Sequence, residues 1–150
     1  MPQSLAKIHL HIIFSTKNRE PLIHADVEKE LYAYMASIGN ELKCFVSKIN
    51  GTKDHVHIAC CLSRTITIAT LLEEVKRSSS KWIKTKGSAY KKFAWQTGYG
   101  AFSFGESQLQ DVVRFINDQK EYHENKTYKE EFRELLEKYK VEYDERYVWD

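Results

Sequence analysis

Long apolar stretches are missing from this sequence, and their absence limits what the protein can be. No segment approaches the roughly 20 consecutive apolar residues that a membrane-spanning helix requires. The first ten residues, MPQSLAKIHL, contain no apolar block of the kind found in a signal peptide. We therefore expect a protein that has no membrane partner and resides in the cytoplasm.

Cysteines are also few. The chain has three, an odd number, and Cys60 and Cys61 are adjacent. This pattern does not make the disulfide framework of a small secreted protein, so we expect buried thiols in a reducing compartment. Internal repeats and low-complexity linkers are absent too. A chain of 150 residues is long enough to bury a core of its own. We expect one domain over residues 1–150, with a C-terminal helical extension from about residue 106.

The net charge of +2 hides an uneven distribution along the chain. Residues 106–150 contain 13 acidic and 8 basic side chains, which leaves 15 basic and 8 acidic ones before them. The segment 76–92 (KRSSSKWIKTKGSAYKK) has seven bases, no acid, and two aromatic residues among them. Cationic and aromatic side chains together suit a phosphate backbone with unstacked bases. A solvated helix face followed by a lysine-rich loop is the alternative interpretation.

The apolar patterns predict four strands and four helices. In residues 7–14, for example, Ile8, Leu10, Ile12 and Phe14 face one way, which is typical of a strand with one face on a core. His9, His11 and Ile13 face the other way. Strands are predicted at 7–14, 44–50, 55–62 and 99–104, and helices at 26–42, 66–84, 109–125 and 128–140. This order corresponds to the ferredoxin-like split β-α-β unit, an α+β fold whose antiparallel sheet has strands 1 and 3 at its centre. Added C-terminal helices complete the predicted architecture.

A histidine pair opens the third predicted strand. In His55-Val56-His57 the two imidazoles point to the same face, away from the apolar set of Val56, Ile58 and Cys60. Imidazoles at this spacing can bind one divalent cation and leave positions open for a third ligand and a substrate oxygen. Paired histidines on a solvated sheet face without a metal are the alternative. His9 and His11 turn the same way on the neighbouring strand, either as two more ligands or as supporting or solvent-facing residues.

Several sequence blocks together resemble the HUH-type single-tyrosine (Y1) transposases of small bacterial insertion sequences. The resemblance covers nearly the whole chain, and the order and spacing of the blocks carry it. They are FSTKNREPLI at 14–23, DHVHI at 54–58, VKRSSSKWI at 75–83, GYGAFS at 98–103, FINDQKEYH at 115–123 and the closing YDERYVWD.

The resemblance implies an HUH endonuclease that cuts single-stranded DNA at the ends of a mobile element and rejoins it. A tyrosine hydroxyl attacks the scissile phosphate, which yields a 5′-phosphotyrosine and a free 3′-OH. By the same resemblance, a Mg²⁺ or Mn²⁺ ion held by His55, His57 and Gln119 polarises the phosphate. Members of the family bind DNA hairpins and act as homodimers. The aromatic tail at 143–149 is a candidate contact in such a dimer.

The sequence departs from the family pattern at the catalytic position. The nucleophilic tyrosine lies four residues before the glutamine, and in this chain that residue is Phe115, which has no hydroxyl. Three explanations remain open. The phenylalanine is an engineered replacement, or a natural copy has lost cleavage and kept DNA binding, or Tyr122 supplies the hydroxyl. The last explanation requires the nucleophile to lie seven residues later in the chain, which is about 10 Å along a helix.

Five basic residues are candidates for DNA contact, and three aromatic ones are candidates for base stacking or for the core. The basic residues are Lys17, Arg19, Lys76, Arg77 and Lys81, and the aromatic ones are Trp95, Tyr99 and Phe102. Three functions follow from these observations: a DNA-cutting transposase with phenylalanine at the nucleophile position, a domesticated binding protein for single-stranded nucleic acid, and a phosphoesterase that uses metal-bound hydroxide.

Overall fold

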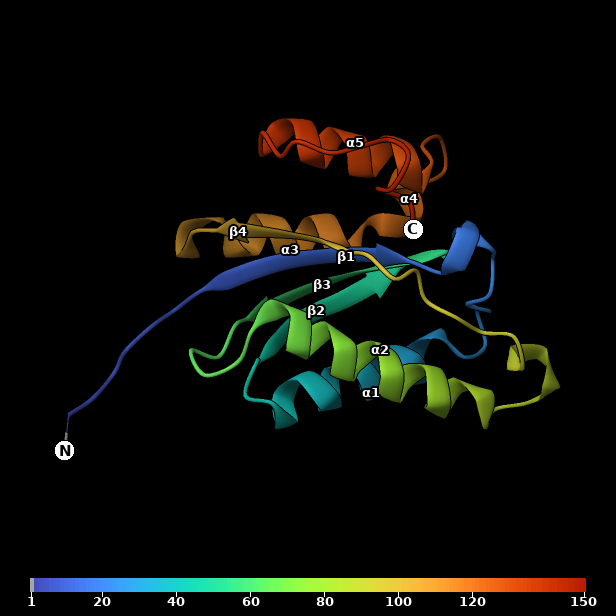
Figure 1. Cartoon of the computed structure of the whole chain (residues 1–150), viewed down its shortest axis with the longest axis horizontal. Helices are drawn as coiled ribbons and strands as arrows, with labels where there is room; N and C mark the ends of the chain where they lie inside the picture. The colour runs from blue at the N-terminus through green and yellow to red at the C-terminus, as the bar shows by residue number, and fades with distance from the viewer. Residues whose placement is uncertain (1) are drawn as a thin grey trace.

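The computed structural model describes residues 2–150, which form a four-stranded antiparallel sheet in the order β2-β3-β1-β4 (Figure 1). β1 and β3 are neighbours at the centre, which confirms the predicted ferredoxin-like α+β fold. The strands are β1 (His9–Ser15), β2 (Val46–Gly51), β3 (His55–Cys61) and β4 (Gly100–Phe104). The helices are α1 (Glu28–Glu41), α2 (Ile68–Lys84), α3 (Leu109–Asn117), α4 (Gln119–Tyr122) and α5 (Tyr128–Lys138), with 3-10 turns η1 (Lys17–Arg19), η2 (Ser88–Tyr90) and η3 (Glu106–Gln108).

The register of the central strands decides which side chains share a face. β1 and β3 pair along their whole length, with His9 opposite Cys61 and Ile13 opposite His57. Residues directly opposite each other in antiparallel strands point to the same side of the sheet. The histidines of both strands therefore lie on one face, and the apolar residues that alternate with them lie on the other, as the alternation predicted.

Helices α1 and α2 cover the apolar face (Figure 1). Leu31 and Met35 of α1 are four residues apart and both are buried, as are Leu72 and Val75 of α2. Side chains at this spacing form one stripe on a helix, and full burial of each contributes about 1.5–3 kcal/mol. Thr67 caps α2 by accepting a hydrogen bond from the backbone N–H of Thr70. This layer is the larger of two hydrophobic cores.

The histidine-bearing face is also covered, which rules out the alternative of paired histidines on a solvated sheet face. Every residue of β1 is buried, and His55 and His57 are fully buried. α3 packs over β2 and β3, while Phe132 and Leu136 of α5 join a second core with residues of β1 and β4. The physical reason is that the C-terminal helices have apolar stripes of their own and bury them on this face.

A glycine allows α5 to approach the sheet closely. At Gly100 of β4, an added Cβ atom would lie 2.9 Å from the ring of Phe132 and 3.1 Å from a methyl group of Ile13. Any other residue would push the aromatic ring outward. Gly100 therefore fixes the distance between α5 and the sheet.

The helix predicted over 109–125 is interrupted, which corrects that prediction. α3 ends at Asn117, Asp118 leaves the helical conformation, and α4 starts at Gln119. The backbone carbonyl of Asn117 accepts a hydrogen bond from the side-chain amide of Asn50 on β2, at 3.0 Å. This contact with the sheet replaces a helical hydrogen bond, which no pattern within residues 109–125 indicates.

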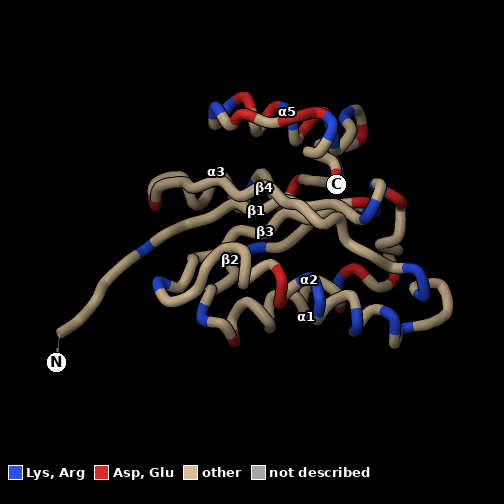
Figure 2. Tube along the Cα trace, in the orientation of Figure 1, with Lys and Arg blue, Asp and Glu red and all other residues tan. Residues whose placement is uncertain are grey.

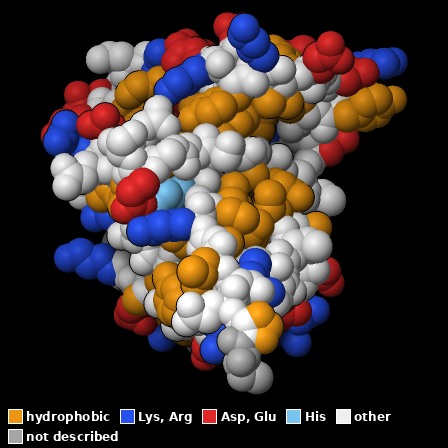
Figure 3. All heavy atoms as spheres, turned by 90° about the vertical axis from the view of Figure 1, so that its left-hand side faces the viewer, with side chains coloured by type: hydrophobic (Ala, Val, Ile, Leu, Met, Phe, Trp, Pro, Cys, Tyr) orange, Lys and Arg blue, Asp and Glu red, His pale blue; other side chains and the backbone are white. Residues whose placement is uncertain are grey.

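The C-terminal tail returns along α5. The Trp149 ring packs against Tyr128 and Phe132, with centroids 6.3 and 5.8 Å away, and its carbonyl accepts a hydrogen bond of 2.6 Å from Arg19. Figure 3 shows apolar side chains gathered in patches on the side from which the N-terminal segment extends. Leu5 and Phe45 are among the exposed apolar residues. Within residues 2–150, no helix has both the length and the apolar character to cross a bilayer.

Candidate functional site

The two histidines of β3 and an amide of α4 converge between the sheet and the C-terminal helices. His55, His57 and Gln119 are all fully buried. Oε1 of Gln119 lies 3.2 Å from Nε2 of His55, although 64 positions separate the two residues in the chain. The three side chains that the sequence pointed to as ligands therefore meet in one place.

Two further residues complete the cluster, and sequence reasoning missed both. Oε1 of Glu131, on α5, accepts hydrogen bonds from Nε2 of His57 at 2.8 Å and Nε2 of His123 at 2.9 Å. The other oxygen of Glu131 accepts one from the Gln119 amide at 3.2 Å. His123 follows Gln119 by four residues, and this helical spacing could have indicated that the two side chains share a face. No pattern in the sequence indicates Glu131, because its position depends on how α5 docks.

The donor set fits a divalent cation. Nitrogen atoms of His55, His57 and His123 and an oxygen of Glu131 all lie within 4.8 Å of one another. Ligands on opposite sides of an ion with bonds of about 2.1 Å are roughly 4.2 Å apart, so a contraction of a few tenths of an ångström closes the site. The oxygen of Gln119 is a fifth donor beside the same imidazoles.

The outward nitrogens of the three imidazoles are each held by a partner, which turns the Nε2 atoms inward. Nδ1 of His55 donates to Asp54 at 2.8 Å, and Nδ1 of His123 lies 2.6 Å from the carbonyl oxygen of Lys126. Nδ1 of His57 lies 2.7 Å from Nε2 of His11. Such outer contacts orient metal-binding histidines and fix their tautomers. His11 thus supports the cluster.

The hydrogen bonds also set the protonation of the cluster. Burial by itself would lower the pKa of His55, but hydrogen bonds to Asp54 and Glu131 raise it to about 9. For His57, burial dominates and lowers the pKa to about 4. Burial opposes ionisation of Glu131, yet hydrogen bonds from His123, His55 and His57 hold the pKa of this carboxyl well below its usual range. An anionic carboxylate therefore lies among the imidazoles.

A pH dependence of stability follows for the protein in a chelator. The folded-state pKa of His55, about 9, exceeds the unfolded value of 6.5, so its stabilising effect is full below pH 6.5 and is lost as pH rises toward 9. Between pH 6.5 and 8 the contribution of His55 to the free energy of unfolding should fall by about 1.5 kcal/mol. Urea denaturation at both pH values measures this. The His55→Gln variant should not show the decrease, and an equal decrease in that variant would contradict the assignment.

Position 115 lies directly beside the cluster. The ring of Phe115 is 5.8 Å from that of His57 and 6.0 Å from that of His11. It also lines a cavity of about 220 Å³ between α3 and α5, together with Phe104, Lys138 and other residues. A second cavity, of about 540 Å³, reaches His123 and Asp54 from another side. The cluster therefore adjoins space large enough for parts of a nucleotide.

Tyr122 lies nearer to position 115 than a continuous helix would allow. Because the helix is interrupted at Asp118, the rings of Phe115 and Tyr122 are 5.1 Å apart. The Tyr122 hydroxyl, however, donates to Glu134 at the surface, at 2.9 Å, and Lys126 binds the other oxygen of the same carboxylate. In this arrangement the hydroxyl is directed away from the imidazoles.

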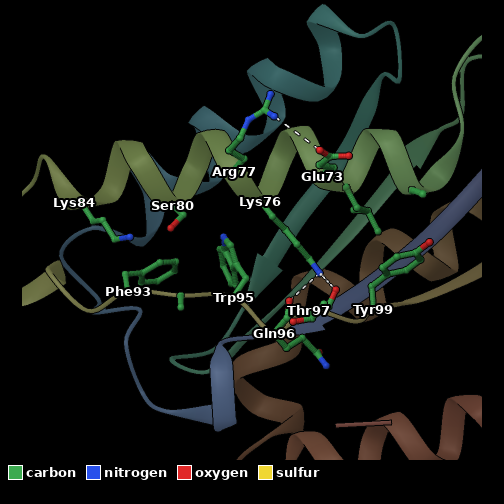
Figure 4. A pocket seen from close by; sticks show the side chains of 13 residues that line it. Glu73, Lys76, Arg77, Ser80, Lys84, Phe93, Trp95, Gln96, Thr97 and Tyr99 are labelled. Atoms are coloured by element: carbon green, nitrogen blue, oxygen red, sulfur yellow. Dashed lines mark hydrogen bonds and ion pairs between the residues drawn. The ribbon is translucent and has the colours of Figure 1, made fainter. Parts of the chain in front are cut away.

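Three basic residues of α2, Lys76, Arg77 and Lys84, border a cavity of about 430 Å³, shown in Figure 4. Lys76 reaches across to the loop before β4, where its ammonium group donates to three backbone carbonyls, those of Gln96, Thr97 and Gly98. Arg77 pairs with Glu73 and Glu74, and Lys81 is exposed. Figure 2 shows basic residues along α2 and the loop that follows it. Lys76 thus positions the loop, and Arg77 and Lys81 remain at the surface.

The other predicted residues lie outside the cluster. Lys17 and Arg19 belong to η1, and Arg19 binds the carbonyl of Trp149. His9 is hydrogen-bonded to Glu106 and lies 3.3 Å from the sulfur of Cys61. Of the expected buried thiols, Cys44 and Cys60 are buried and Cys61 is half-buried.

The fold and the site are those expected of HUH-type proteins. The ferredoxin-like sheet carries a buried histidine pair, and a glutamine lies beside it. The chain belongs to the IS200-like transposase family: the family model described as "Transposase IS200 like" matches residues 4–119. This match confirms the resemblance to single-tyrosine transposases. A comparison with curated protein sequences gives no match.

Two of the solved structures that share the fold are the following. A transposase candidate from Deinococcus radiodurans R1 is 17% identical, with a TM-score of 0.61 over 79% of this chain and 98% of that one. A REP-associated tyrosine transposase bound to a REP hairpin is 11% identical, with a TM-score of 0.61 over 83% of this chain and 73% of that one. At these identities the likeness concerns the fold.

Proposed function

We propose that this chain is an HUH endonuclease-type protein that binds single-stranded, hairpin-bearing DNA at the ends of an insertion sequence, where active members of the family cut and rejoin the strand. The observation that supports this function best is the convergence of His55, His57 and Gln119 beside the ring of residue 115. The hairpin bound to the structurally similar REP-associated transposase supports DNA as the partner.

The proposed chemistry assigns one task to each side chain. His55, His57 and Gln119 would hold Mg²⁺ or Mn²⁺, which supplies positive charge that polarises the scissile phosphate. A tyrosine oxygen at position 115 would form the bond to phosphorus as the bond to the 3′ oxygen breaks. The tyrosine loses its proton and the departing 3′ oxygen gains one, which gives a 5′-phosphotyrosine and a free 3′-OH. Phe115 has no oxygen, so we propose that this chain binds DNA and does not cleave it.

The absent hydroxyl specifically favours a second candidate, a non-catalytic binding protein for single-stranded nucleic acid. Both functions would use the same fold and the same proposed DNA-binding residues. They differ in whether the phenylalanine at position 115 is natural. The codon for residue 115 in the source genome tells an engineered replacement from a natural one. A tyrosine codon would identify an engineered block.

Incubation of the chain with end-labelled single-stranded DNA and Mn²⁺ tests the proposal. Binding without cleavage is expected. Free DNA fragments would instead indicate a phosphoesterase that uses hydroxide, and a covalent protein–DNA band would identify Tyr122 as a substitute nucleophile. A chain that does not bind hairpin-bearing single-stranded DNA at all would overturn the proposed function.

We propose that basic residues of η1 and α2 contact the DNA backbone: Lys17, Arg19, Lys76, Arg77 and Lys81. Because the ammonium group of Lys76 is already bound by three carbonyls, the double variant Arg77→Ala/Lys81→Ala is the sharper test. We expect about tenfold weaker DNA binding and a salt dependence reduced by about 0.7 per lost contact. Anisotropy titrations at several salt concentrations measure both. Arg146→Ala, a change in the tail beyond α5, is the control, and an equal loss there would refute the α2 contact.

We also propose a homodimer, as in the family. β2 and β4 are the edges of the sheet, and unpaired edges are available for pairing with a second copy. The molar mass in solution, from light scattering, tests this assembly.

A further inference from the structure

We propose that His123 and Glu131 are ligands of the same ion as His55, His57 and Gln119, that the resulting site prefers a transition-metal dication to Mg²⁺, and that the bound ion fastens the C-terminal helices to the sheet. This inference rests on the proposed metal centre and adds two ligands, a metal class and a structural role to it.

The chemistry of the donor set is the first argument. Three imidazole nitrogens and one carboxylate oxygen lie within 4.8 Å of one another, with an amide oxygen beside them. Imidazole nitrogen binds Co²⁺ and Zn²⁺ well, whereas Mg²⁺ prefers carboxylate, carbonyl and water oxygens. A set with three nitrogens therefore favours the transition metals.

Burial is the second argument. The exposed fractions of the side chains are 0% for His55 and His57, 1% for Glu131 and 9% for His123. Mg²⁺ loses its water molecules reluctantly and usually keeps several of them. Five protein donors leave one of the six positions of an octahedral ion open, which is enough for one phosphate oxygen but not for the several waters that Mg²⁺ keeps. Zn²⁺ and Co²⁺ accept protein ligands in their place.

The orientation of the imidazoles is the third argument. The three Nε2 atoms all face Glu131, at 2.8 Å for His57, 2.9 Å for His123 and 3.4 Å for His55. Each Nδ1 faces a group that accepts a hydrogen bond: the Asp54 carboxylate, the Lys126 carbonyl, or Nε2 of His11 when His11 carries its hydrogen on Nδ1. In the structure, the Nε2 atoms of His57 and His123 donate their protons to Glu131. A bound ion would displace these Nε2 protons. Each imidazole would then keep its proton on Nδ1, where a partner is already in place, and offer the Nε2 lone pair to the metal.

The ligands come from three separate parts of the chain. His55 and His57 lie on β3, and Glu131 lies on α5. Gln119 begins α4, and His123 follows its last residue. An ion bound by all of them restrains the two helices against the sheet. The family match ends at residue 119, so His123 and Glu131 lie outside the matched residues.

The test is calorimetric titration of the chelator-treated full chain with Co²⁺, Zn²⁺ and Mg²⁺. We expect Co²⁺ and Zn²⁺ to bind at least about 100-fold more tightly than Mg²⁺. His123→Ala and Glu131→Gln should each weaken Co²⁺ binding by about 10–100-fold. Glu131→Gln keeps the size and shape of the buried side chain, so it separates loss of a ligand from the loss of packing that His123→Ala causes against His55. His24→Ala, an exposed histidine outside the cluster, should bind like the original chain.

Hydrogen exchange supplies a readout that does not depend on activity. Saturating Co²⁺ should slow amide exchange in residues 119–136, and His123→Ala should abolish that protection. If the original chain binds no ion, the metal-dependent function fails together with this inference. If it binds Co²⁺ and both variants bind equally well, or Mg²⁺ binds as tightly as Co²⁺, only this inference is overturned.

Discussion

Replacing Phe115 by tyrosine is expected to produce a covalent protein–DNA adduct that the present chain does not form. The ring at 115 already lies against His57 and His11 and borders the 220 Å³ cavity, so the substitution adds a hydroxyl to a side chain that is in place. Correct placement of a nucleophile accounts for many orders of magnitude in rate, so the change should be from no detectable adduct to a readily detected one. Denaturing gel electrophoresis of labelled single-stranded DNA with Mn²⁺ measures it.

Phe104→Tyr is the matched control for this experiment. Phe104 lines the same cavity but stacks on His9 rather than on the cluster, so its hydroxyl should give no adduct. Adding His57→Ala to Phe115→Tyr should remove the adduct again. If Phe115→Tyr binds DNA and gives none, the nucleophile assignment is wrong and the domesticated binding protein is the better description.

Phe132→Ala should cause a large loss of stability, although the residue lies outside the cluster. Phe132 is 3% exposed and is the residue that packs over Gly100, Tyr128 and Trp149. Truncation of a buried phenylalanine costs about 3–5 kcal/mol, and the cavity left here lies between α5 and the sheet. Urea denaturation should show that loss, and because Glu131 is the preceding residue, metal affinity should fall as well.

Phe45→Ala provides the comparison for this second prediction. Phe45 has the same side chain but is 63% exposed, so its truncation should change the free energy of unfolding by no more than about 0.5 kcal/mol. Similar effects at both positions would show that α5 contributes little to the stability of the sheet.

Local patterns along the chain were sufficient for the fold. Alternation in β1 and β3, helical spacing in α1 and α2, and the sequence of elements predicted the ferredoxin-like sheet and the neighbours at its centre. These patterns indicate which side chains share one face of a strand or helix. The face depends only on the repeat of two residues in a strand and 3.6 residues in a helix. The same alternation placed His55 and His57 on one face, apart from Val56 and Ile58.

The resemblance to Y1 transposases identified site residues that the periodicity of apolar residues does not reveal. Gln119 by itself would pass as an ordinary helical residue, and only the order of the motif blocks connected it with the histidine pair 64 positions away. The same blocks revealed that Phe115 is unusual. Phenylalanine beside Val112 and Ile116 otherwise reads as common packing.

The amino-acid sequence by itself determined the strands, the helices, the faces they present and the missing hydroxyl at position 115. Only the tertiary structure decided that the histidine face is buried, that the helix is interrupted at Asp118, and that Glu131 and His123 join the cluster. The physical reason is distance along the chain. Glu131 meets His57 across 74 positions because α5 docks through Phe132 and Leu136, and such docking depends on the shape of the whole sheet surface rather than on any local period.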